Sequence, residues 1–595
     1  MNPVVDAGGI CDHIAMYSIR LSRSAPLWVA AVVALTIAGC DAPTAPQLVT
    51  HSLSQPLTGP CPTDPSVLGQ GEFVGDVSEF GATISGPDIS EPLMAGGTGS
   101  LTIDNVPEGE NRIIALFGLA NGQARWRGVS APTTVVKDVP QTVDIVLAAV
   151  SDFSCARTAS GAHVFHTATP LNDGTVLVVG GAATMVDASV ACGGQGNGGP
   201  CLKATATASA AVYDPKTGVF IPAGRLAQGR MFHTATKLAD GRVVIAGGAG
   251  EATFFMTTSA TRPFPVVPDA PIVSVEVFDP TTRQFTSAAN DPGGARIFAA
   301  STTLLSGEAL ITGGIPSRAQ TGNHDLSNAL KTTTICGGNV VACRAGPPMV
   351  SARAGHVAFT TEPQGVYLWG GSVDTSVDGH HVEYLQPDGA AFVRLLRASM
   401  FGPSTVNPDN RTRKNIFFAG VAQYVDYRVL IAGGLTRKTT GEFSAEFSDL
   451  AYIFDVGGDD KDLSENDVKG GVTPPVRMQS RRIFTSAAGL PDESSGIVIG
   501  GFDADDLATI DWTPSGALDL FSEAVVGTPD ARMSTLDVVG TPRTMRQPRG
   551  GATATAIGDG TVVIVGGYTG NDDIAETAEV FADRLTPPQA AEYVK

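Results

Sequence analysis

The chain has little positive charge. It carries 39 lysine and arginine residues against 59 aspartate and glutamate residues, a formal net charge of −20 over 595 residues. Partners rich in phosphate require clustered basic side chains, so we do not expect this chain to bind nucleic acid. Only 16% of the residues are charged, whereas 43% are apolar and 70 are glycine. This composition favours turn-rich β structure over disorder, and the length predicts at least two domains or one large repeat array.

The apolar run near the N-terminus is too short to span a bilayer as a helix. It extends over twelve residues, Leu27 to Ala38, and follows two arginines. It ends Ile37-Ala38-Gly39-Cys40, which resembles the signal of bacterial lipoproteins; an ordinary secretory signal is the alternative. The resemblance implies that Cys40 carries the lipid.

By this resemblance, residues 1–39 are a lipoprotein signal peptide, with the start at Met1 or Met16, and residues 40–60 form a flexible tether rich in Pro, Thr and Ser. The protein is then expected to be extracytoplasmic and anchored by lipid to a bacterial membrane, facing the periplasm or the cell surface.

Few cysteines remain beyond the signal. Six are left once Cys11 and Cys40 are set aside, an even number that suits an exported protein. Two pairs are close in sequence and one is distant. We therefore hypothesise three disulfides: Cys192 with Cys201, Cys336 with Cys343, and Cys61 with Cys155.

A strand-like segment ending in a double glycine occurs seven times. The first glycines of these pairs lie 57 to 67 residues apart, at Gly180, Gly247, Gly313, Gly370, Gly433, Gly500 and Gly566. Another alternating strand precedes most of them, as in FHTATPL and FHTATKL, and Asp-Gly between the two is typical of a two-residue hairpin. A second hairpin follows, for example AVYDPKTGVF. Four antiparallel strands per repeat predict one propeller blade each.

A double glycine followed by two large aromatic residues resembles the Kelch repeat. Tyr213 with Phe220 and Phe278 with Phe285 have the Kelch spacing, and the resemblance covers about residues 155–583. The fold class that it implies is all-β, a seven-bladed Kelch-type β-propeller with a small N-terminal β-sandwich.

The ends of the repeat region suggest how the propeller closes. The last blade lacks a fourth strand, and the segment around Phe153 is expected to supply it, so that residues 151–595 form the propeller. Residues 61–150 lack the repeat and alternate in short runs, which predicts a prealbumin-like β-sandwich.

The connections between the second and third strands of each blade are long and share one face, which we call the rim. Long loops on a rigid scaffold are the usual place for binding, and both close cysteine pairs are expected near this rim. We therefore expect a binding or adhesion module for a protein or glycan. An arginine starts the inner strand of five blades and could bind an acidic ligand there or pair with backbone carbonyls: Arg230, Arg296, Arg353, Arg482 and Arg549.

The remaining candidates are histidines and acidic runs that could be considered as metal ligands. His166, His233 and His356 occupy equivalent places in three blades and are expected to pack between blades rather than to bind metal. The adjacent His380 and His381 are not expected to share a metal. Acidic runs at 459–467 and 503–506 are expected to be solvated surface, with calcium as the alternative.

The enzymatic alternative comes from the Kelch resemblance alone. Galactose oxidase is a copper oxidoreductase on this fold, and its site needs two tyrosines, two histidines and a cysteine bonded to one tyrosine. Another carbohydrate-active enzyme is also an alternative. We expect no catalytic residue, no metal ligand and no resident cofactor, with copper and calcium left open.

Overall fold

The structure is a computed structural model of the whole chain. It describes residues 30–35, 47–53, 61, 79–86, 88–89, 93–97, 108–120, 123–129, 133–136, 141–149, 153–156, 160–161, 163–193, 200–215, 218–257, 264–316, 326–361, 365–373, 382–387, 389–395, 415–425, 428–437, 445–455, 471–472, 476–490, 495–503, 510–522, 533, 544–557 and 561–582. The described part is all-β and its sheets are overwhelmingly antiparallel, as predicted. Its helices are one short α-helix, α1 (Ser189–Gly193), and one 3₁₀ turn, η1 (Leu326–Asn328). None of the described helices has the length and apolar character needed to cross a membrane.

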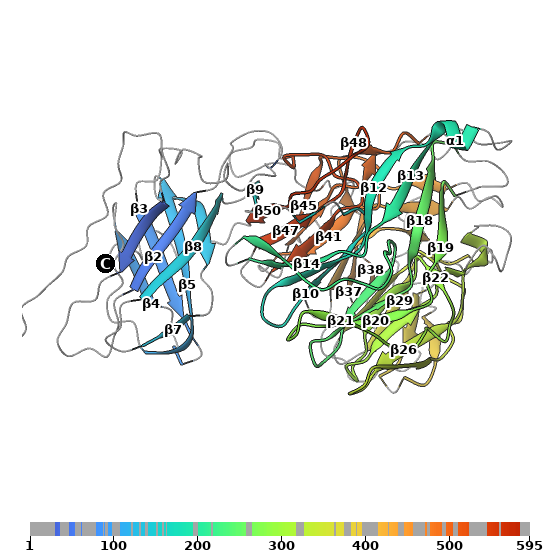
Figure 1. The fold of residues 1–595 in the computed structure, drawn as a ribbon, viewed down its shortest axis with the longest axis horizontal. Helices are drawn as coiled ribbons and strands as arrows, with labels where there is room; N and C mark the ends of the chain where they lie inside the picture. Colours follow the sequence, from blue (N-terminus) through green and yellow to red (C-terminus); the bar gives the residue numbers. More distant parts are fainter. Residues whose placement is uncertain are drawn as a thin grey trace, which may run out of the picture.

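The N-terminal region forms one eight-stranded sheet (Figure 1). Its strand order is β1-β2-β8-β6-β5-β3-β4, with β7 paired to β5 and β2 parallel to β8. The strands are β1 (Ala30–Leu35), β2 (Gln47–Leu53), β3 (Glu79–Ser85), β4 (Leu93–Gly97), β5 (Gly109–Ala120), β6 (Gln123–Val129), β7 (Thr133–Val135) and β8 (Gln141–Ala149). A sandwich requires a second, facing sheet, and the described residues of this region contain only the one. The structure is that of the uncleaved chain, so the signal peptide and tether stay predictions.

Seven sheets of similar topology follow, which we call sheets 1 to 7 in chain order. Sheets 1 to 3 each have four strands: β10 (Thr167–Pro170), β11 (Val176–Val179), β14 (Ala210–Asp214) and β15 (Val219–Pro222); β16 (Thr234–Lys237), β17 (Val243–Ala246), β20 (Val275–Asp279) and β21 (Gln284–Ser287); β23 (Ala300–Thr303), β24 (Ala309–Thr312), β26 (Thr333–Gly337) and β27 (Ala342–Ala345).

Sheets 4 to 6 vary more in strand number. They contain β28 (Val357–Thr361), β29 (Gly365–Trp369), β30 (Val382–Leu385) and β31 (Phe392–Leu395); β33 (Gly420–Val425), β34 (Arg428–Ala432) and β37 (Leu450–Asp455), which pairs with both β38 (Gly471–Val472) and β39 (Val476–Arg477); and β41 (Ser486–Gly489), β42 (Ser495–Ile499) and β45 (Leu518–Ser522). Sheet 7 contains β46 (Thr553–Ala556), β47 (Thr561–Val565), β50 (Glu579–Ala582) and β9 (Phe153–Cys155).

The fourth strand of sheet 7 comes from the start of the repeat region. Phe153 pairs with Phe581 and Cys155 with Glu579, which is the pairing predicted for the segment around Phe153. The first strands of the sheets also contact one another in sequence: β10 with β16, β16 with β23, β23 with β28, β33 with β41, β41 with β46, and β46 with β10. The arrangement is therefore propeller-like, with the first strands innermost.

Every double glycine lies where two neighbouring sheets come close together. Gly247 and Gly248 have φ values of 71° and 93°, which a residue with a side chain rarely adopts. A Cβ on Gly247 would lie 2.6 Å from the carbonyl oxygen of Arg296 in the next sheet. The double glycine is thus required by both the backbone conformation and this close approach. We call this end of the sheets the glycine end.

The opposite end carries the Asp-Gly turns, and we call it the turn end. In sheet 1 the amide of Leu171 donates to the Thr175 carbonyl, so residues 172–174 form the turn. The turn has three residues between the paired positions rather than the two predicted. Asp173 stabilises it by accepting from the backbone amide of Thr175 at 3.0 Å.

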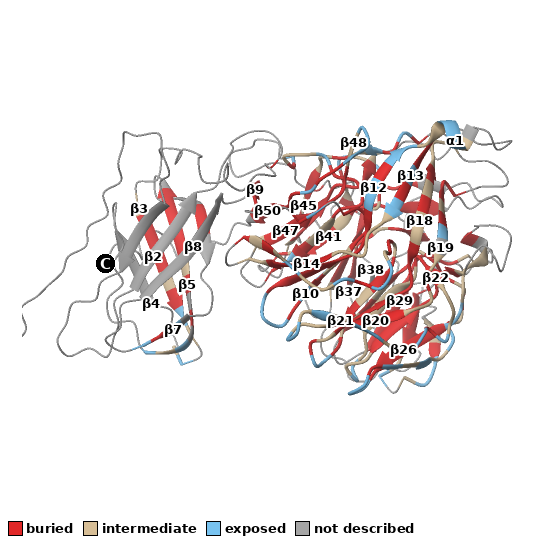
Figure 2. Ribbon diagram, viewed as in Figure 1, coloured by how far each residue is buried: buried red, intermediate tan, exposed pale blue. Residues whose placement is uncertain are grey.

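Apolar side chains fill the space between neighbouring sheets, and Figure 2 shows the buried residues running through all of them. Alternate residues of β11 face sheets on either side, since Val176 and Val178 belong to one cluster and Leu177 and Val179 to another. This double burial explains why the strands before each double glycine are mostly continuous apolar runs.

Candidate functional site

The five predicted arginines are buried. None has more than 1% of its surface exposed. Each forms an ion pair with a buried carboxylate: Arg230 with Glu276 at 2.5 Å, Arg296 with Asp291 at 2.9 Å, Arg353 with Glu383 at 3.0 Å, Arg549 with Glu579 at 2.9 Å, and Arg482 with Asp519.

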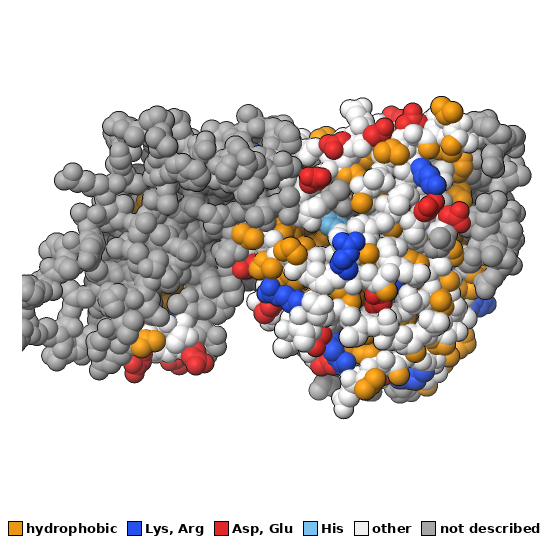
Figure 3. Space-filling model, in the orientation of Figure 1, with side chains coloured by type: hydrophobic (Ala, Val, Ile, Leu, Met, Phe, Trp, Pro, Cys, Tyr) orange, Lys and Arg blue, Asp and Glu red, His pale blue; other side chains and the backbone are white. Residues whose placement is uncertain are grey.

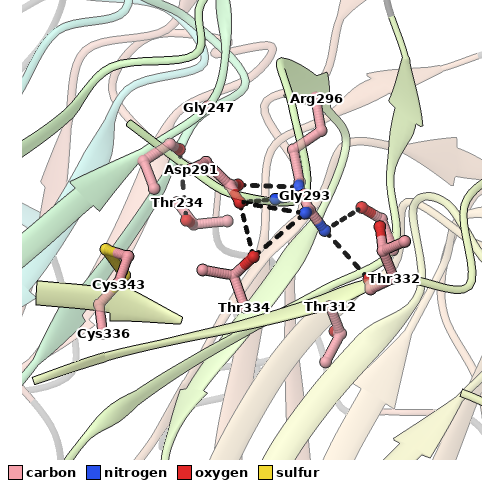
Figure 4. Close-up of polar contacts among 12 residues, drawn as sticks. Thr234, Gly247, Asp291, Gly293, Arg296, Thr312, Thr332, Thr334, Cys336 and Cys343 are labelled. Carbon is pink, nitrogen blue, oxygen red and sulfur yellow. Dashed lines mark hydrogen bonds and ion pairs between the residues drawn. A yellow bond between two sulfur atoms is a disulfide. The ribbon is translucent and has the colours of Figure 1, made fainter. Parts of the chain in front are cut away.

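Each arginine also holds the double glycine of its own sheet. Its Nη1 donates to the carbonyl of the first glycine, for example from Arg296 to Gly313 at 3.1 Å and from Arg549 to Gly566 at 2.7 Å. Figure 4 shows Arg296 between Asp291 and the residues Thr332 and Thr334, which accept further hydrogen bonds. Of the two roles considered for these arginines, pairing with backbone carbonyls is the one that these contacts show. The alternative, binding an acidic ligand, is corrected, because every guanidinium faces an internal carboxylate and none reaches the surface.

The sixth member of this set was missed in the sequence. His163 stands in sheet 1 where the others have arginine, and its Nδ1 lies 2.6 Å from the carbonyl oxygen of Gly180. The separation of 17 residues equals that between Arg230 and Gly247. This nearly constant separation from the double glycine, 17 residues in most sheets and 18 between Arg482 and Gly500, is the signal that could have identified His163. In sheet 5 this position is held by Ile416. Its carbonyl oxygen approaches Gly370 of the preceding sheet, just as the Arg296 carbonyl oxygen approaches Gly247.

The three repeat histidines connect different sheets and do not come together. The Nε2 of His166 lies 2.7 Å from the Thr553 hydroxyl, and that of His233 lies 2.9 Å from the Thr167 hydroxyl. His356 contacts Thr312 at 2.8 Å. Burial lowers the pKa of His233 and of His356 to about 3, and that of His166 well below its usual range. These side chains are neutral packing residues, as their repeated position suggested.

Five phenylalanines close the channel at the glycine end. They form a ring in which neighbouring side chains have centroids 4.5 to 5.1 Å apart: Phe165, Phe232, Phe298, Phe418 and Phe484. All five have φ between 54° and 58°. Gly355 and Gly551 hold the equivalent places in sheets 4 and 7, also with positive φ. Aromatic rings in mutual contact leave no passage along the axis at this level.

The long connections of sheets 1 and 2 are not irregular loops. They contain β12 (Ala182–Asp187) and β13 (Cys201–Ala206) from sheet 1, and β18 (Ala249–Phe255) and β19 (Val266–Pro271) from sheet 2. These strands form a four-stranded sheet, which we call the cap sheet, in the order β12-β13-β18-β19. Smaller sheets of two or three short strands occupy other connections at this end: β22 (Arg296–Ile297) with β25 (Ile315–Pro316), β32 (Ile416–Phe417) with β35 (Leu435–Arg437) and β36 (Ala445–Phe447), β40 (Arg482–Ile483) with β43 (Phe502–Asp503) and β44 (Thr513–Pro514), and β48 (Tyr568–Gly570) with β49 (Asp573–Ile574).

The cap sheet covers the phenylalanine ring. Its Phe254 stacks on Phe165 at 5.3 Å and meets Trp512, which comes from sheet 6, at 5.1 Å. The indole of Trp512 donates to the carbonyl of Phe255 at 3.0 Å. Residues from sheets far apart in the chain are therefore joined across the axis, and one apolar cluster unites ring and cap.

The outer face of the cap sheet is exposed. Val186, Lys203, Thr253 and Val267 lie in one row across its four strands, because they are cross-strand partners. Val186 is 41% exposed, and Lys203 forms an ion pair with Glu251 at 2.9 Å. In the view of Figure 3 acidic and basic side chains are scattered over the described surface rather than gathered by sign.

All three hypothesised disulfides are present. Cys192–Cys201 joins α1 to the cap sheet, at the rim where it was expected. Cys336 pairs with Cys343 across β26 and β27, whose turn lies at the opposite, turn end. The placement of this second pair at the rim was wrong, because residues 327–350 contain the third and fourth strands of sheet 3 instead of a rim loop.

The turn end of the channel is hollow. A cavity of about 520 Å³ lies between the first strands of sheets 3, 4 and 5. Its walls include Thr302 and Thr303 of β23, Thr360 of β28, and Val421 and Gln423 of β33. This cavity lies at the opposite end from the predicted binding face, and no sequence motif marks it.

The described residues do not supply a copper or calcium site. They contain no group of three or more His, Cys, Asp or Glu side chains that could hold a metal ion, and the six described cysteines are all in disulfides. A cysteine bonded to tyrosine, which galactose oxidase requires, is thus not available among them. Cys40, His380, His381 and the acidic run at 459–467 lie outside the described residues, as do residues 504–506.

Comparison with known proteins places the chain near two solved structures. No protein-family model and no curated protein sequence matches it. A fungal alcohol oxidase of the AA5 family, in complex with copper, shares 15% sequence identity over 71% of this chain and 75% of its own, with a TM-score of 0.43. YjhT shares 12% identity over 72% of this chain and 97% of its own, with a TM-score of 0.40. At this similarity neither the copper nor the oxidase activity can be transferred to this chain.

Proposed function

We propose that the protein is a non-catalytic binding module outside the cytoplasm, built as a closed seven-bladed Kelch-type propeller. Sheets 1 to 7 would be the blades. The pairing of β9 with β50 and the contact of β46 with β10 support closure of the ring. The three disulfides suit an oxidising compartment. Attachment to a bacterial membrane through a lipid on Cys40 is part of this proposal.

The cap sheet is the observation that carries the proposed function. Its inner residues Met185, Ala204 and Ala252 are buried in the central cluster, which fixes the sheet to the scaffold. Its outer rows, Val186-Lys203-Thr253-Val267 and Thr184-Thr205-Glu251-Asp269, mix apolar, hydroxyl and paired charged side chains. A rigid surface of this kind loses little entropy on binding and suits a macromolecule, either a protein or a glycan.

Two exposed valines allow a matched test. Val186 lies on the outer face of the cap sheet, whereas Val340 is 87% exposed in the turn between β26 and β27 at the turn end. A photoreactive amino acid placed at position 186 in the producing cell should form an adduct with the ligand, and the same amino acid at position 340 should not. Equal adducts from both positions, or none from position 186, would contradict the proposal.

Purified protein then separates the two ligand classes. If the ligand is a glycan, binding on a glycan array should fall at least about tenfold in Val186→Arg and stay unchanged in Val340→Arg, because the new side chain obstructs the contact face. If the ligand is a protein, Val186→Arg should weaken binding of the cross-linked partner, and Val340→Arg should leave that binding unchanged. Stoichiometric copper in the purified protein would overturn the non-catalytic assignment.

A further inference from the structure

The cavity at the turn end is a blind pocket. Among the described residues, the phenylalanine ring closes the channel at the glycine end, and at the turn end of the pocket Leu305 is 38% exposed. Its volume of about 520 Å³ lies in the range of small-molecule sites. It is separated from the outer face of the cap sheet by the whole length of the sheets.

The hydroxyl groups of the pocket have a defined direction of hydrogen bonding. Thr303 donates to the carbonyl of Lys237 at 2.7 Å, and Thr360 donates to the carbonyl of Thr303 at 2.6 Å, because a carbonyl can only accept. Thr302 and Thr360 lie 2.9 Å apart. Since the single proton of Thr360 is already used, Thr302 must donate to Thr360.

All three hydroxyl protons are therefore committed inside the protein. The oxygen atoms of Thr302, Thr303 and Thr360 keep unused lone pairs, so these side chains offer a ligand acceptors and no donors. Among the described residues that line the pocket none is charged. Leu304, Leu305, Ala358 and Val421 supply an apolar wall beside the hydroxyls, and Gln423 adds an amide, which can donate as well as accept. Acceptor oxygens repel anions, and they pair well with ligand hydroxyl groups.

We propose that this pocket binds a neutral polyhydroxylated small molecule, such as a mono- or disaccharide. Sugar hydroxyls would donate to the three threonine oxygens, while the C–H face of the sugar would pack against the aliphatic wall. The site does not depend on the proposed function of the cap sheet, and the two can be tested apart.

Titration calorimetry of the full-length protein with glucose, galactose and maltose tests the proposal. At least one of these sugars should bind with a Kd below about 50 mM. The Kd of glucuronate should be at least about tenfold higher because of its carboxylate. Absence of binding by all three sugars, or equal binding of glucuronate, would overturn the proposal.

Two variants locate the site. Val421→Trp should fill the pocket and abolish binding. Thr302→Val keeps the shape, removes one acceptor oxygen, and should weaken binding about tenfold. Thr236→Val is the matched control, because Thr236 is an inner-strand threonine whose hydroxyl bonds Ser301 outside the pocket.

The control variant should bind as the wild type does. Unchanged binding in Thr302→Val and in a folded Val421→Trp would place the sugar elsewhere and sink the proposal. A Val186→Arg variant on the cap sheet should leave sugar binding unaffected, so a failure of this proposal can be told from a failure of the proposed function.

Discussion

A buried arginine stabilises a fold only when its charge meets a counter-charge. In this protein the partner is supplied from the third strand in most sheets, by Glu276, Glu383, Asp519 and Glu579. Sheet 3 differs, since Asp291 comes from the segment before Arg296 and Thr334 links the two. The same task is thus performed by carboxylates at different sequence positions.

Removing one partner of such a pair should be costly. Arg353→Met leaves the carboxylate of Glu383 buried without its counter-charge, and we expect a loss of about 3–5 kcal/mol in the free energy of unfolding. Urea denaturation measures it. Lys203→Met breaks the exposed pair with Glu251 and should change stability by no more than about 1 kcal/mol. Similar losses in the two variants would show that the Arg353 pair is not structural.

Buried histidines make stability depend on acidity. The folded pKa of His356 is about 3, below the value near 6.5 expected in the unfolded chain. Between these values the unfolded chain binds a proton that the folded protein does not. The contribution of His356 is therefore complete above pH 6.5 and is lost as the pH falls toward 3.

Replacement of His356 should flatten this acid dependence. From pH 7 to pH 4, wild type should lose about 3 kcal/mol more stability than His356→Asn, measured by urea denaturation at each pH. Thr312→Val removes the hydrogen-bond partner without removing a titrating group, so its cost should be the same at both pH values. Parallel pH profiles of wild type and His356→Asn would show that folding leaves the pKa of His356 unchanged, against the lowering expected from its burial.

At the level of the strand, the sequence predicts what repeats and misses what does not. The double glycines, the apolar second strands and the extra strand at Phe153 recur or complete a pattern, so they could be identified. The cap sheet could not, because β13 pairs with β18 from a different repeat and the two segments share no periodic motif. The turn-end pocket depends on the spacing of three strands, which the sequence does not encode locally. Its threonines resemble those of the first strands β10, β16 and β46.

The phenylalanine ring occupies an intermediate position between these cases. Arg230-Met231-Phe232 and Arg296-Ile297-Phe298 carry the ring residue two positions after the arginine, so the pattern is visible in the sequence. Its positive φ is not visible, because a phenylalanine in that conformation is unusual and is held only by surrounding contacts.

Gly355 of the ring and Gly389, which lies outside it, together test this packing. A Cβ on Gly355 would lie 2.6 Å from the Phe418 ring, whereas Gly389 has nothing within 4 Å of that position. The φ values, 60° and 67°, are alike, so Gly→Ala strains the backbone equally at both sites. We expect Gly389→Ala to cost about 1 kcal/mol and Gly355→Ala clearly more, by thermal denaturation. Equal losses would mean that the phenylalanine ring is loosely packed.

Across the whole molecule, the segment of β9 joins three parts of the chain. It pairs with β50 at the end of the repeat region, and Cys155 bonds to Cys61 from the N-terminal region. Arg546 donates to the carbonyl of Phe153 at 2.9 Å, and Phe153 packs on Phe581 at 5.3 Å. The stability of sheet 7 should therefore depend on residues more than 400 positions away.

Loss of this disulfide should destabilise the unit as a whole. Cys61 and Cys155 are 94 residues apart, and a cross-link over such a loop is worth about 4–5 kcal/mol through the unfolded chain. The Cys61→Ala/Cys155→Ala double variant should melt earlier by calorimetry, and its β50 amides should exchange faster. The Cys336–Cys343 disulfide spans a separation of only 7 residues, so the Cys336→Ala/Cys343→Ala variant should lose less free energy of unfolding. A larger loss in Cys336→Ala/Cys343→Ala than in Cys61→Ala/Cys155→Ala would contradict the role of β9 in stabilising sheet 7.

The position of β9 also sets the order in which the protein can be completed. A ribosome makes β9 early and its partner β50 only after some 420 further residues, the separation between Ser154 and Val580 being 426. Until β50 has been made, β9 has no partner strand, and sheet 7 cannot form. Since the other six sheets contain only strands made before β50, sheet 7 is the last of the seven that can be completed.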